Sequence, residues 1–263
     1  MATPFARALS HIVGWAADRK VPTRLRPAVY KGYARLCGAD LSESRGPLEI
    51  YPSLSAFFVR RLVDGARPIA GATDQIACPV DGTVQAIGPV HEGSTLQAKG
   101  RGYGVRELLA GVGADVELEG GHAWTVYLSP RDYHRIHAPE DCALEEVAWV
   151  PGARYSVAPK VLDRRDVLAV NERVVLRLET EHGPLLLVLV GALNVGRMRV
   201  IGVQPTPRRP VEPPRPFARG EELARFEMGS TIVLLSPAGG LEPLDGLGEG
   251  DTVKMGAPLA RWS

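Results

Sequence analysis

Cysteine is scarce in this chain of 263 residues, which contains only Cys37, Cys78 and Cys142. Three scattered cysteines cannot form a disulfide framework, and none of them has the C-x-x-C spacing that is typical of metal ligands. The sequence therefore favours a reducing compartment. At this length the chain can bury an ordinary hydrophobic core without covalent cross-links.

Long apolar runs are also absent. No window offers the roughly eighteen or more apolar residues that span a bilayer. The first residues lack the uninterrupted apolar core of a signal peptide, because Arg7, His11 and Asp18 interrupt it. We therefore expect any contact with a membrane to take place at its surface.

A strong net charge is a third absence, since the formal value is only +1. This balance argues against a dedicated nucleic-acid binder, and 45% hydrophobic with 23% charged residues is typical of a globular protein. The charge is nevertheless unevenly distributed. Before Asp40 the single acid Asp18 faces seven basic residues, which are Arg7, Arg19, Lys20, Arg24, Arg26, Lys31 and Arg35. The first segment is cationic and the remainder is net acidic.

Helical spacing of apolar residues predicts two basic amphipathic helices, one over 4–16 and one over 25–36 that ends at Gly38. A third, shorter helix is predicted in "PSLSAFFVRRL", with Ser53 as its N-cap. Two interpretations of the basic helices remain open. They dock on anionic lipid, where each basic residue adds about 1 kcal/mol, or their apolar stripes pack on the domain behind them.

From about residue 75 onward, short β segments alternate with glycine and proline. We predict the α+β class, with short N-terminal amphipathic helices before a mostly antiparallel β domain of compact sandwich or barrel type. The expected division is a helical, cationic, membrane-facing segment over 1–65 and a β-rich catalytic domain over 66–263. The stretch 204–216 carries six prolines, so it is a surface loop or an edge strand.

Candidate chemistry lies in three stretches. "CPVDGTV" contains Asp81 in a turn, although Asp-Gly is a common turn pair by itself. "YLSPRDYHRIHAP" places His134 and His137 three residues apart, next to Asp132, and its prolines disfavour a regular helix. "FEMGSTIVLL" puts Gly229 and Ser230 before an apolar β run.

A serine becomes nucleophilic when a histidine, oriented by a carboxylate, accepts its proton. Asp81, His137 and Ser230 could supply this set, and the carbonyl that precedes Ser230 belongs to Gly229, which tolerates strained geometry. Attack on that carbonyl is an N-to-O acyl shift. β-Elimination from the resulting ester leaves dehydroalanine, which hydrolyses to a pyruvoyl group and ammonia. A bare Gly-Ser pair would still be read as a turn.

Five motifs together change this interpretation: "FFVRRL" with "GARPI", "PVDGTV", "YLSPRDYHRIHAP", "GALNVGRM" and "FEMGSTIVLL". In this order they resemble the pyruvoyl-dependent phosphatidylserine decarboxylases of bacteria, and the resemblance covers almost the whole chain. The cleavage motif of that family is usually Leu-Gly-Ser-Thr. Here Met228 replaces the leucine, which exchanges one apolar side chain for another and leaves the Gly-Ser bond intact.

The resemblance implies conversion of phosphatidylserine to phosphatidylethanolamine and CO2. It implies that Asp81, His137 and Ser230 form the charge relay for self-cleavage, which gives a large chain 1–229 and a small chain 230–263. Ser230 then becomes the covalent pyruvoyl cofactor, which forms a Schiff base with the substrate amine and accepts electrons as CO2 leaves. His134 is the predicted proton donor, and Asp132 is a helper in positioning or proton exchange.

The resemblance also implies that both chains remain associated, and it leaves a homodimer open. Because the substrate resides in an anionic membrane, it favours lipid docking of the basic helices and a peripheral location on the cytoplasmic face of the cell membrane. No nucleic acid is expected as a partner. For Arg60 and Arg61, a scaffold role and contact with the lipid headgroup remain equally open.

Two alternatives compete with this interpretation. A zinc hydrolase would use His134, His137 and a carboxylate such as Asp81 or Asp141, although a third histidine at ligand spacing is missing. A carrier module would use Lys254, because "GEGDTVKMGAPLARW" has the hairpin pattern of biotinyl and lipoyl domains. That alternative leaves the histidine segment without a purpose.

Overall fold

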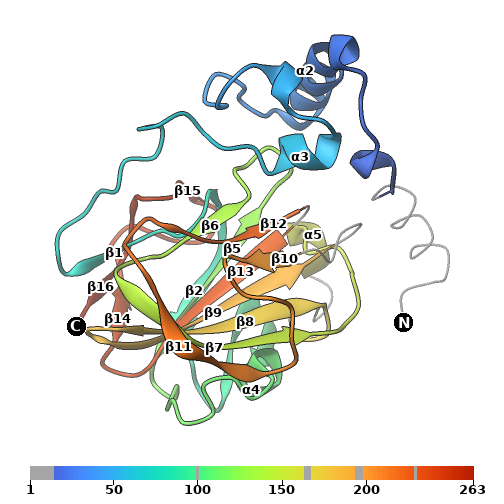
Figure 1. The fold of residues 1–263 in the computed structure, drawn as a ribbon. Helices are drawn as coiled ribbons and strands as arrows, with labels where there is room; N and C mark the ends of the chain where they lie inside the picture. The colour runs from blue at the N-terminus through green and yellow to red at the C-terminus, as the bar shows by residue number, and fades with distance from the viewer. Residues whose placement is uncertain (1–14, 99–100, 163–166, 193–197, 228–229) are drawn as a thin grey trace.

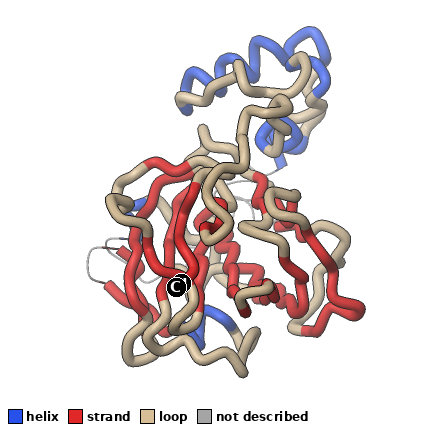
Figure 2. Tube along the Cα trace, turned by 90° about the vertical axis from the view of Figure 1, so that its left-hand side faces the viewer, coloured by secondary structure: helices blue, strands red, loops and turns tan. Residues whose placement is uncertain are grey.

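A computed structural model describes residues 15–98, 101–162, 167–192, 198–227 and 230–263. The helical residues near the N-terminus form a cap at one end of a body built mainly of strands (Figure 1). Figure 2 shows the same separation from a second direction, with the cap helices grouped beyond the strands. The predicted helix over 4–16 lies almost entirely outside the described residues, while residues 15–18 are helical.

The cap contains short helices, and two of the sequence predictions are confirmed there. The second basic helix ends at Gly38, which adopts φ 75° and so stops the helix in the left-handed conformation. Ser53 caps the third helix by accepting a hydrogen bond from the Ala56 amide at 3.2 Å. The elements are η1 (Thr23–Leu25), α2 (Arg26–Cys37), η2 (Leu48–Ile50) and α3 (Leu54–Phe58).

An aromatic cluster gives the cap a core of its own. The rings of Tyr30 and Phe57 are stacked with centroids 4.7 Å apart, and Tyr51 meets both rings edge-on. The Tyr30 hydroxyl donates to the Tyr51 carbonyl at 2.7 Å, which satisfies a polar group that would otherwise be buried without a partner. α2 and α3 are thereby fixed to each other.

The body is built of antiparallel strands around one eight-stranded sheet with the order β11-β7-β8-β9-β13-β5-β2-β15. Smaller sheets have the orders β1-β16-β14, β10-β12-β6 and β3-β4. The α+β class is confirmed, and the described strands form no closed barrel. The strands are β1 (Gln75–Ala77), β2 (Gly82–Pro89), β3 (Ser94–Ala98), β4 (Arg101–Gly104), β5 (His122–Leu128), β6 (Arg135–His137), β7 (Cys142–Val150), β8 (Arg173–Thr180), β9 (Gly183–Gly191), β10 (Met198–Val200), β11 (Arg209–Phe217), β12 (Glu222–Phe226), β13 (Ser230–Ser236), β14 (Leu241–Pro243), β15 (Thr252–Val253) and β16 (Pro258–Trp262).

Both faces of the large sheet are buried. Leu187 and Leu234 point into a core that the smaller sheets also line, whereas Val188 and Val233 point into a second core on the opposite face. The second core includes α4 (Val105–Leu109), and α5 (Pro159–Leu162) packs there too. Strands buried on two faces carry apolar residues at every position, which explains the continuous run in β9.

The proline-rich stretch forms β11, at one edge of the large sheet, where it pairs with β7. The edge prediction is therefore confirmed. A proline has no amide hydrogen to donate, so only a strand with one unpaired side accommodates several of them.

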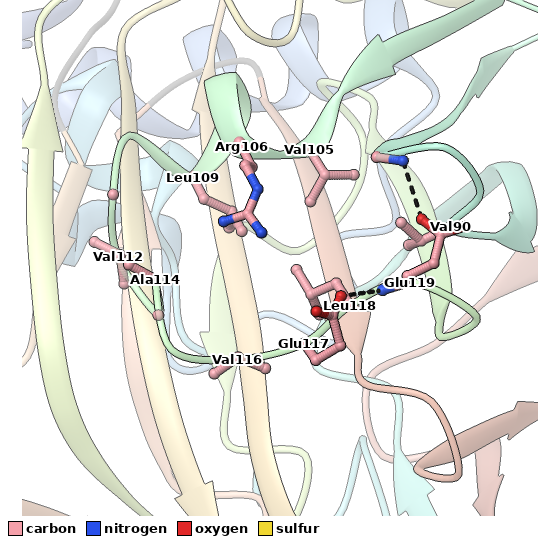
Figure 3. A pocket seen from close by; sticks show the side chains of 13 residues that line it. Val90, Val105, Arg106, Leu109, Val112, Ala114, Val116, Glu117, Leu118 and Glu119 are labelled. Atoms are coloured by element: carbon pink, nitrogen blue, oxygen red, sulfur yellow. Dashed lines mark hydrogen bonds between the residues drawn. The ribbon is translucent and has the colours of Figure 1, made fainter.

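A cavity of about 400 Å³ lies beside α4, at the end of the body away from the cap (Figures 1 and 3). Figure 3 shows apolar side chains such as Val105 and Leu109 around it, with the Arg106 guanidinium at its side. None of the residues expected to carry chemistry lines this cavity, so the candidate site lies elsewhere.

Candidate active site

Ser230 is the first residue of β13 and lies in the middle of the large sheet. Its register partners are Leu128 on β5 and Gly191 on β9. The serine is fully buried, and its Oγ has no hydrogen-bond partner among the described residues. The Thr231 hydroxyl is in the same situation. Leaving a buried hydroxyl unpaired costs about 1–3 kcal/mol, so this position is not explained by stability.

The segment before Ser230 connects two sheets. β12 belongs to the small sheet, where it pairs with β6, and β13 belongs to the large one. The Phe226 amide donates to the His134 carbonyl at 3.0 Å, so the connection starts beside the histidine segment. Met228 and Gly229, which precede Ser230 at the predicted cleavage site, lie outside the described residues.

His137 ends β6 and is held by three contacts. Its amide donates to the Pro79 carbonyl at 2.9 Å, two residues before Asp81. Its Nδ1 lies 2.8 Å from the Gly220 carbonyl, and its Nε2 lies 3.1 Å from the Tyr133 hydroxyl. A carbonyl can only accept, so Nδ1 carries the proton and Nε2 keeps the lone pair that a base needs. Burial lowers the pKa of this imidazole, which keeps it neutral.

Asp81 is buried and bound by Arg67. The Arg67 Nε and Nη2 donate to the two carboxylate oxygens at 2.6–3.1 Å, and the Met255 amide donates to Oδ1 at 2.8 Å. Within the described ranges no hydrogen bond joins Asp81 to His137, or His137 to Ser230. The fold thus brings Asp81 near His137 without forming a hydrogen-bonded relay, and the relay roles stay predictions.

His134 is almost completely buried and packs on Phe58 of the cap, with ring centroids 4.0 Å apart. Its Nδ1 donates to the Asp132 carbonyl at 2.8 Å, while its Nε2 has no partner among the described residues. Burial lowers the pKa of His134 to about 3, so the ring is neutral near pH 7 and Nε2 carries an unprotonated lone pair. The predicted role as a proton donor requires that His134 first gain a proton, and it stays a prediction.

Asp132 organises the turn before His134. Its Oδ2 accepts hydrogen bonds from the Ser129 amide and hydroxyl, both at 2.7 Å. Together with the contact from its carbonyl to His134, this arrangement makes Asp132 a residue that positions the histidine. Its predicted help in proton exchange stays untested.

Three residues of the site were missed in the sequence analysis, although all lie in the quoted motifs. Tyr133 contacts His137, Arg67 of "GARPI" binds Asp81, and Phe58 of "FFVRRL" covers His134. Burial raises the pKa of Tyr133 to about 12, so its hydroxyl stays protonated and can donate to His137. The sequence does place Tyr133 four residues before His137, but a tyrosine in a β-rich region usually packs in the core, so this spacing alone did not indicate the contact.

A polar cavity of about 160 Å³ lies between the cap and the body, next to these residues. Arg60 and Arg61 are separated here: Arg60 lines the cavity and is buried, whereas the Arg61 side chain is exposed and pairs with Glu222. The other lining residues are Gly38, Asp40, Glu43, Leu62, Arg67, Asp81, Arg131, Asp132, Tyr133 and Lys254.

The structure does not support the zinc alternative, because in the part of the chain that it describes no group of three or more His, Cys, Asp or Glu side chains could hold a metal ion. His134 and His137 lie three residues apart on an extended segment, so their side chains point to opposite faces. Asp141 is exposed and binds the Arg219 amide. For the carrier alternative, Lys254 follows the edge strand β15 and pairs with Glu43 at 3.7 Å.

Comparison with known proteins shows the family of this chain. A model of the family described as phosphatidylserine decarboxylase matches residues 54–261. This chain belongs to the phosphatidylserine decarboxylase family. A phosphatidylserine decarboxylase proenzyme of Pseudomonas aeruginosa (strain LESB58) is 38% identical over 96% of this chain and 92% of its own length. The proenzymes of Yersinia enterocolitica and Aliivibrio salmonicida are 36% and 37% identical over 96% of this chain, and 91% and 93% of their own lengths are covered.

Proposed function

We propose that this member of the phosphatidylserine decarboxylase family converts phosphatidylserine to phosphatidylethanolamine and CO2. The observation that carries the proposal is the placement of Ser230. Ser230 is the first residue of β13, and its buried hydroxyl has no hydrogen-bond partner among the described residues. Four residues earlier, the Phe226 amide donates to the His134 carbonyl, so the serine follows closely on the histidine segment. The near full-length similarity to proteins named as proenzymes supports an activity that appears only after cleavage.

We propose that the chain cleaves itself between Gly229 and Ser230. The Ser230 Oγ attacks the Gly229 carbonyl carbon, the C–N bond breaks, and an ester joins the two halves while the amine is protonated. Elimination then breaks the Cβ–O bond and releases Gly229 as a carboxylate, and water converts the remaining dehydroalanine to a pyruvoyl group with loss of ammonia. His137 is the base, because its Nε2 is unprotonated and has a lone pair, which accepts a hydrogen bond from the Tyr133 hydroxyl until the reaction begins. Asp81 acts through its charge, which raises the pKa of His137 against the effect of burial.

The surroundings of Ser230 fit a pyruvoyl group. Ser230 is fully buried, and its hydroxyl forms no hydrogen bond within the described ranges. Conversion of this residue to a planar ketone therefore breaks no hydrogen bond of that hydroxyl with the described residues. A pyruvoyl group supplies an electrophilic carbonyl and an electron sink for the loss of CO2. The chain contributes His134, whose unpartnered Nε2 can take up and return a proton, and Phe58, which excludes water from it.

We propose further that the protein binds the cytoplasmic face of the cell membrane through the cap. Six of the eight large apolar side chains that are exposed in the described residues belong to the cap: Trp15, Leu25, Val29, Leu36, Ile50 and Val63. The basic residues of the same segment favour anionic lipid. Among the described helices, none has the length and apolar character required to traverse a bilayer.

The small chain of the cleaved form would stay attached to the large one. β13 pairs with β9 and β5 on its two sides, and β15 and β16 pair with β2 and β1 of the large chain. The resemblance leaves a homodimer open. It is tested by the mass of the protein in detergent.

Two measurements on one preparation test the proposed function. Intact mass spectrometry is expected to show two chains, 1–229 and 230–263, with a ketone in place of the amine of residue 230. The same sample is expected to release ¹⁴CO2 from carboxyl-labelled phosphatidylserine. The Ser230→Ala variant is expected to stay uncleaved and inactive. Decarboxylation by an uncleaved chain, or cleavage that survives Ser230→Ala, would overturn the proposal.

A further inference from the structure

Arg60 is a buried cation with unused hydrogen-bond donors. The residue is only 3% exposed, and within the described ranges its one hydrogen bond runs from Nη2 to the Arg131 carbonyl at 3.2 Å. The Nε and Nη1 groups have no partner among the described residues. Burial lowers the pKa of Arg60, yet arginine stays protonated at any physiological pH. A buried charge with free donors is costly, so it requires an explanation.

The cavity that Arg60 lines contains other cations, and each of them already has a carboxylate partner. Arg67 binds Asp81 and Glu43, Lys254 lies 3.7 Å from Glu43, and the Arg131 Nε lies 3.7 Å from Asp132. Among the described lining residues, Arg60 is the cation without an ion pair. The cavity therefore has one cation in its wall, Arg60, that lacks a carboxylate partner.

This point adjoins the proposed chemistry. Arg60 follows α3, two residues after Phe58, whose ring covers His134. The positive charge of Arg60 contributes to the lowered pKa of His134, and Asp132 and Tyr133 line the same cavity. An anion bound to Arg60 would thus lie beside the histidine segment.

We propose that Arg60 binds the phosphodiester of the phospholipid headgroup and so fixes the distance between the membrane and the site of decarboxylation. This inference rests on the proposed function. The guanidinium of arginine matches phosphate oxygens with two parallel hydrogen bonds. The phosphate keeps its charge throughout the reaction, so its ion pair with Arg60 stabilises the ground state and the transition state equally and does not raise the barrier.

The carboxylate of the substrate is the less suitable partner for Arg60. Its negative charge flows into the electron sink as CO2 leaves, so an ion pair with Arg60 would stabilise the ground state more than the transition state. A cation at that position would slow the step that the site must accelerate. The phosphodiester is therefore the anion that the charge of Arg60 fits.

The test measures binding separately from catalysis, in the uncleaved Ser230→Ala background. Calorimetry follows the binding of dihexanoyl phosphatidylethanolamine below its micellar concentration, a ligand with a phosphodiester and no carboxylate. Arg60→Met is expected to weaken binding tenfold or more, because it removes hydrogen bonds to a charged phosphate and each tenfold change in Kd corresponds to about 1.4 kcal/mol. Arg60→Lys is expected to restore part of it. The matched control is Arg45→Met, because Arg45 is an exposed cap residue outside the cavity that pairs with Asp64.

Two further ligands identify the bound group. Equal dependence on Arg60 is expected for dihexanoyl phosphatidylserine, since it shares the phosphodiester. Dependence with phosphatidylserine alone would assign Arg60 to the carboxylate and overturn the proposal. Binding of inorganic phosphate that depends on Arg60, with lipid binding that does not, would assign the cavity to a free anion and also overturn it.

A structural role for Arg60 predicts a different result. Urea unfolding of Arg60→Met is expected to show equal or greater stability, because an apolar side chain of similar length replaces an incompletely paired buried charge. Loss of stability together with loss of binding, in both the Met and the Lys variants, would make Arg60 a scaffold residue. Release of CO2 by the wild type without Arg60-dependent binding defeats this inference alone. Headgroup binding that depends on Arg60 in a protein that releases no CO2 defeats the proposed function instead.

Discussion

Arg67 donates hydrogen bonds to the Asp81 carboxylate from two nitrogen atoms at 2.6–3.1 Å, and the same guanidinium donates to the Glu43 carboxylate at 2.7–2.9 Å. Glu43 belongs to the cap segment, whereas Asp81 belongs to the body and directly precedes β2. One arginine with a buried side chain therefore joins the cap to the carboxylate that we expect to assist self-cleavage. The orientation of Asp81 depends on a residue that performs no chemistry itself.

Replacing Arg67 by methionine is expected to destabilise the fold. The change leaves the buried Asp81 without its cation, and breaking a buried ion pair by removing one partner costs about 3–5 kcal/mol. Urea unfolding of the Ser230→Ala form measures this difference without interference from cleavage. Arg45→Met, which removes an exposed pair, is the control, with an expected change below about 1 kcal/mol. Equal midpoints for the two variants would refute the expectation.

His134 is expected to make stability depend on pH. Its pKa is about 3 in the folded chain against 6.5 for an unperturbed histidine, so the unfolded chain binds the proton more readily. The stability that neutral His134 provides is complete above pH 6.5, and it is lost as the pH falls toward 3, at about 1.4 kcal/mol per pH unit. The free energy of unfolding between pH 7 and pH 4 is the measurement. His134→Gln should flatten the curve, and an unchanged slope would show that His134 is not buried as a neutral ring.

Tyr133→Phe is expected to accelerate self-cleavage. The Tyr133 hydroxyl donates to the Nε2 lone pair of His137, which is the same lone pair that must accept the Ser230 proton. Removing a hydrogen bond of about 1 kcal/mol frees the base and raises the rate up to about tenfold. Band intensities on denaturing gels after synthesis in vitro give this rate. Slower cleavage would instead place the Tyr133 hydroxyl in the path of the proton.

The two chains of the cleaved protein are expected to separate only when the fold is lost. β13 lies inside the large sheet, and residues such as Leu234 and Val233 are fully buried on opposite faces. Gel filtration without denaturant should give one peak that contains both chains. In a urea series, the release of the small chain and the loss of the circular dichroism signal should share one midpoint. Release at lower urea would contradict this arrangement.

Leu36→Asp is expected to weaken binding to vesicles that contain phosphatidylserine. Leu36 is 86% exposed on the cap, so the substitution removes an apolar contact with lipid without disturbing the core. A loss of about 1.5 kcal/mol or more corresponds to roughly tenfold weaker binding in a flotation assay. Val170→Asp is the control, because Val170 is exposed outside the cap. Equal losses in both variants would remove the cap as the binding surface.

Local signals in the sequence were sufficient for much of the fold. Gly38 predicted the end of α2, Ser53 predicted the start of α3, and the prolines of 204–216 predicted a surface loop or an edge strand, because each of these effects acts within a few residues. The barrel or sandwich geometry was less determined. An apolar run such as β9 predicted a strand, but the order of the strands and the burial of both sheet faces depend on contacts between distant segments.

The candidate site divides in the same way. The sequence by itself determined the residue types and the motif order that assign the chain to its family, with Ser230 after Gly229 and the two histidines three residues apart. Only the tertiary structure decided that Arg67 rather than His137 binds Asp81, that His134 lies under Phe58, and that Arg60 is buried where Arg61 is exposed. Hydrogen-bond partners, burial and pKa shifts arise where segments far apart in the chain meet, and no local pattern specifies them.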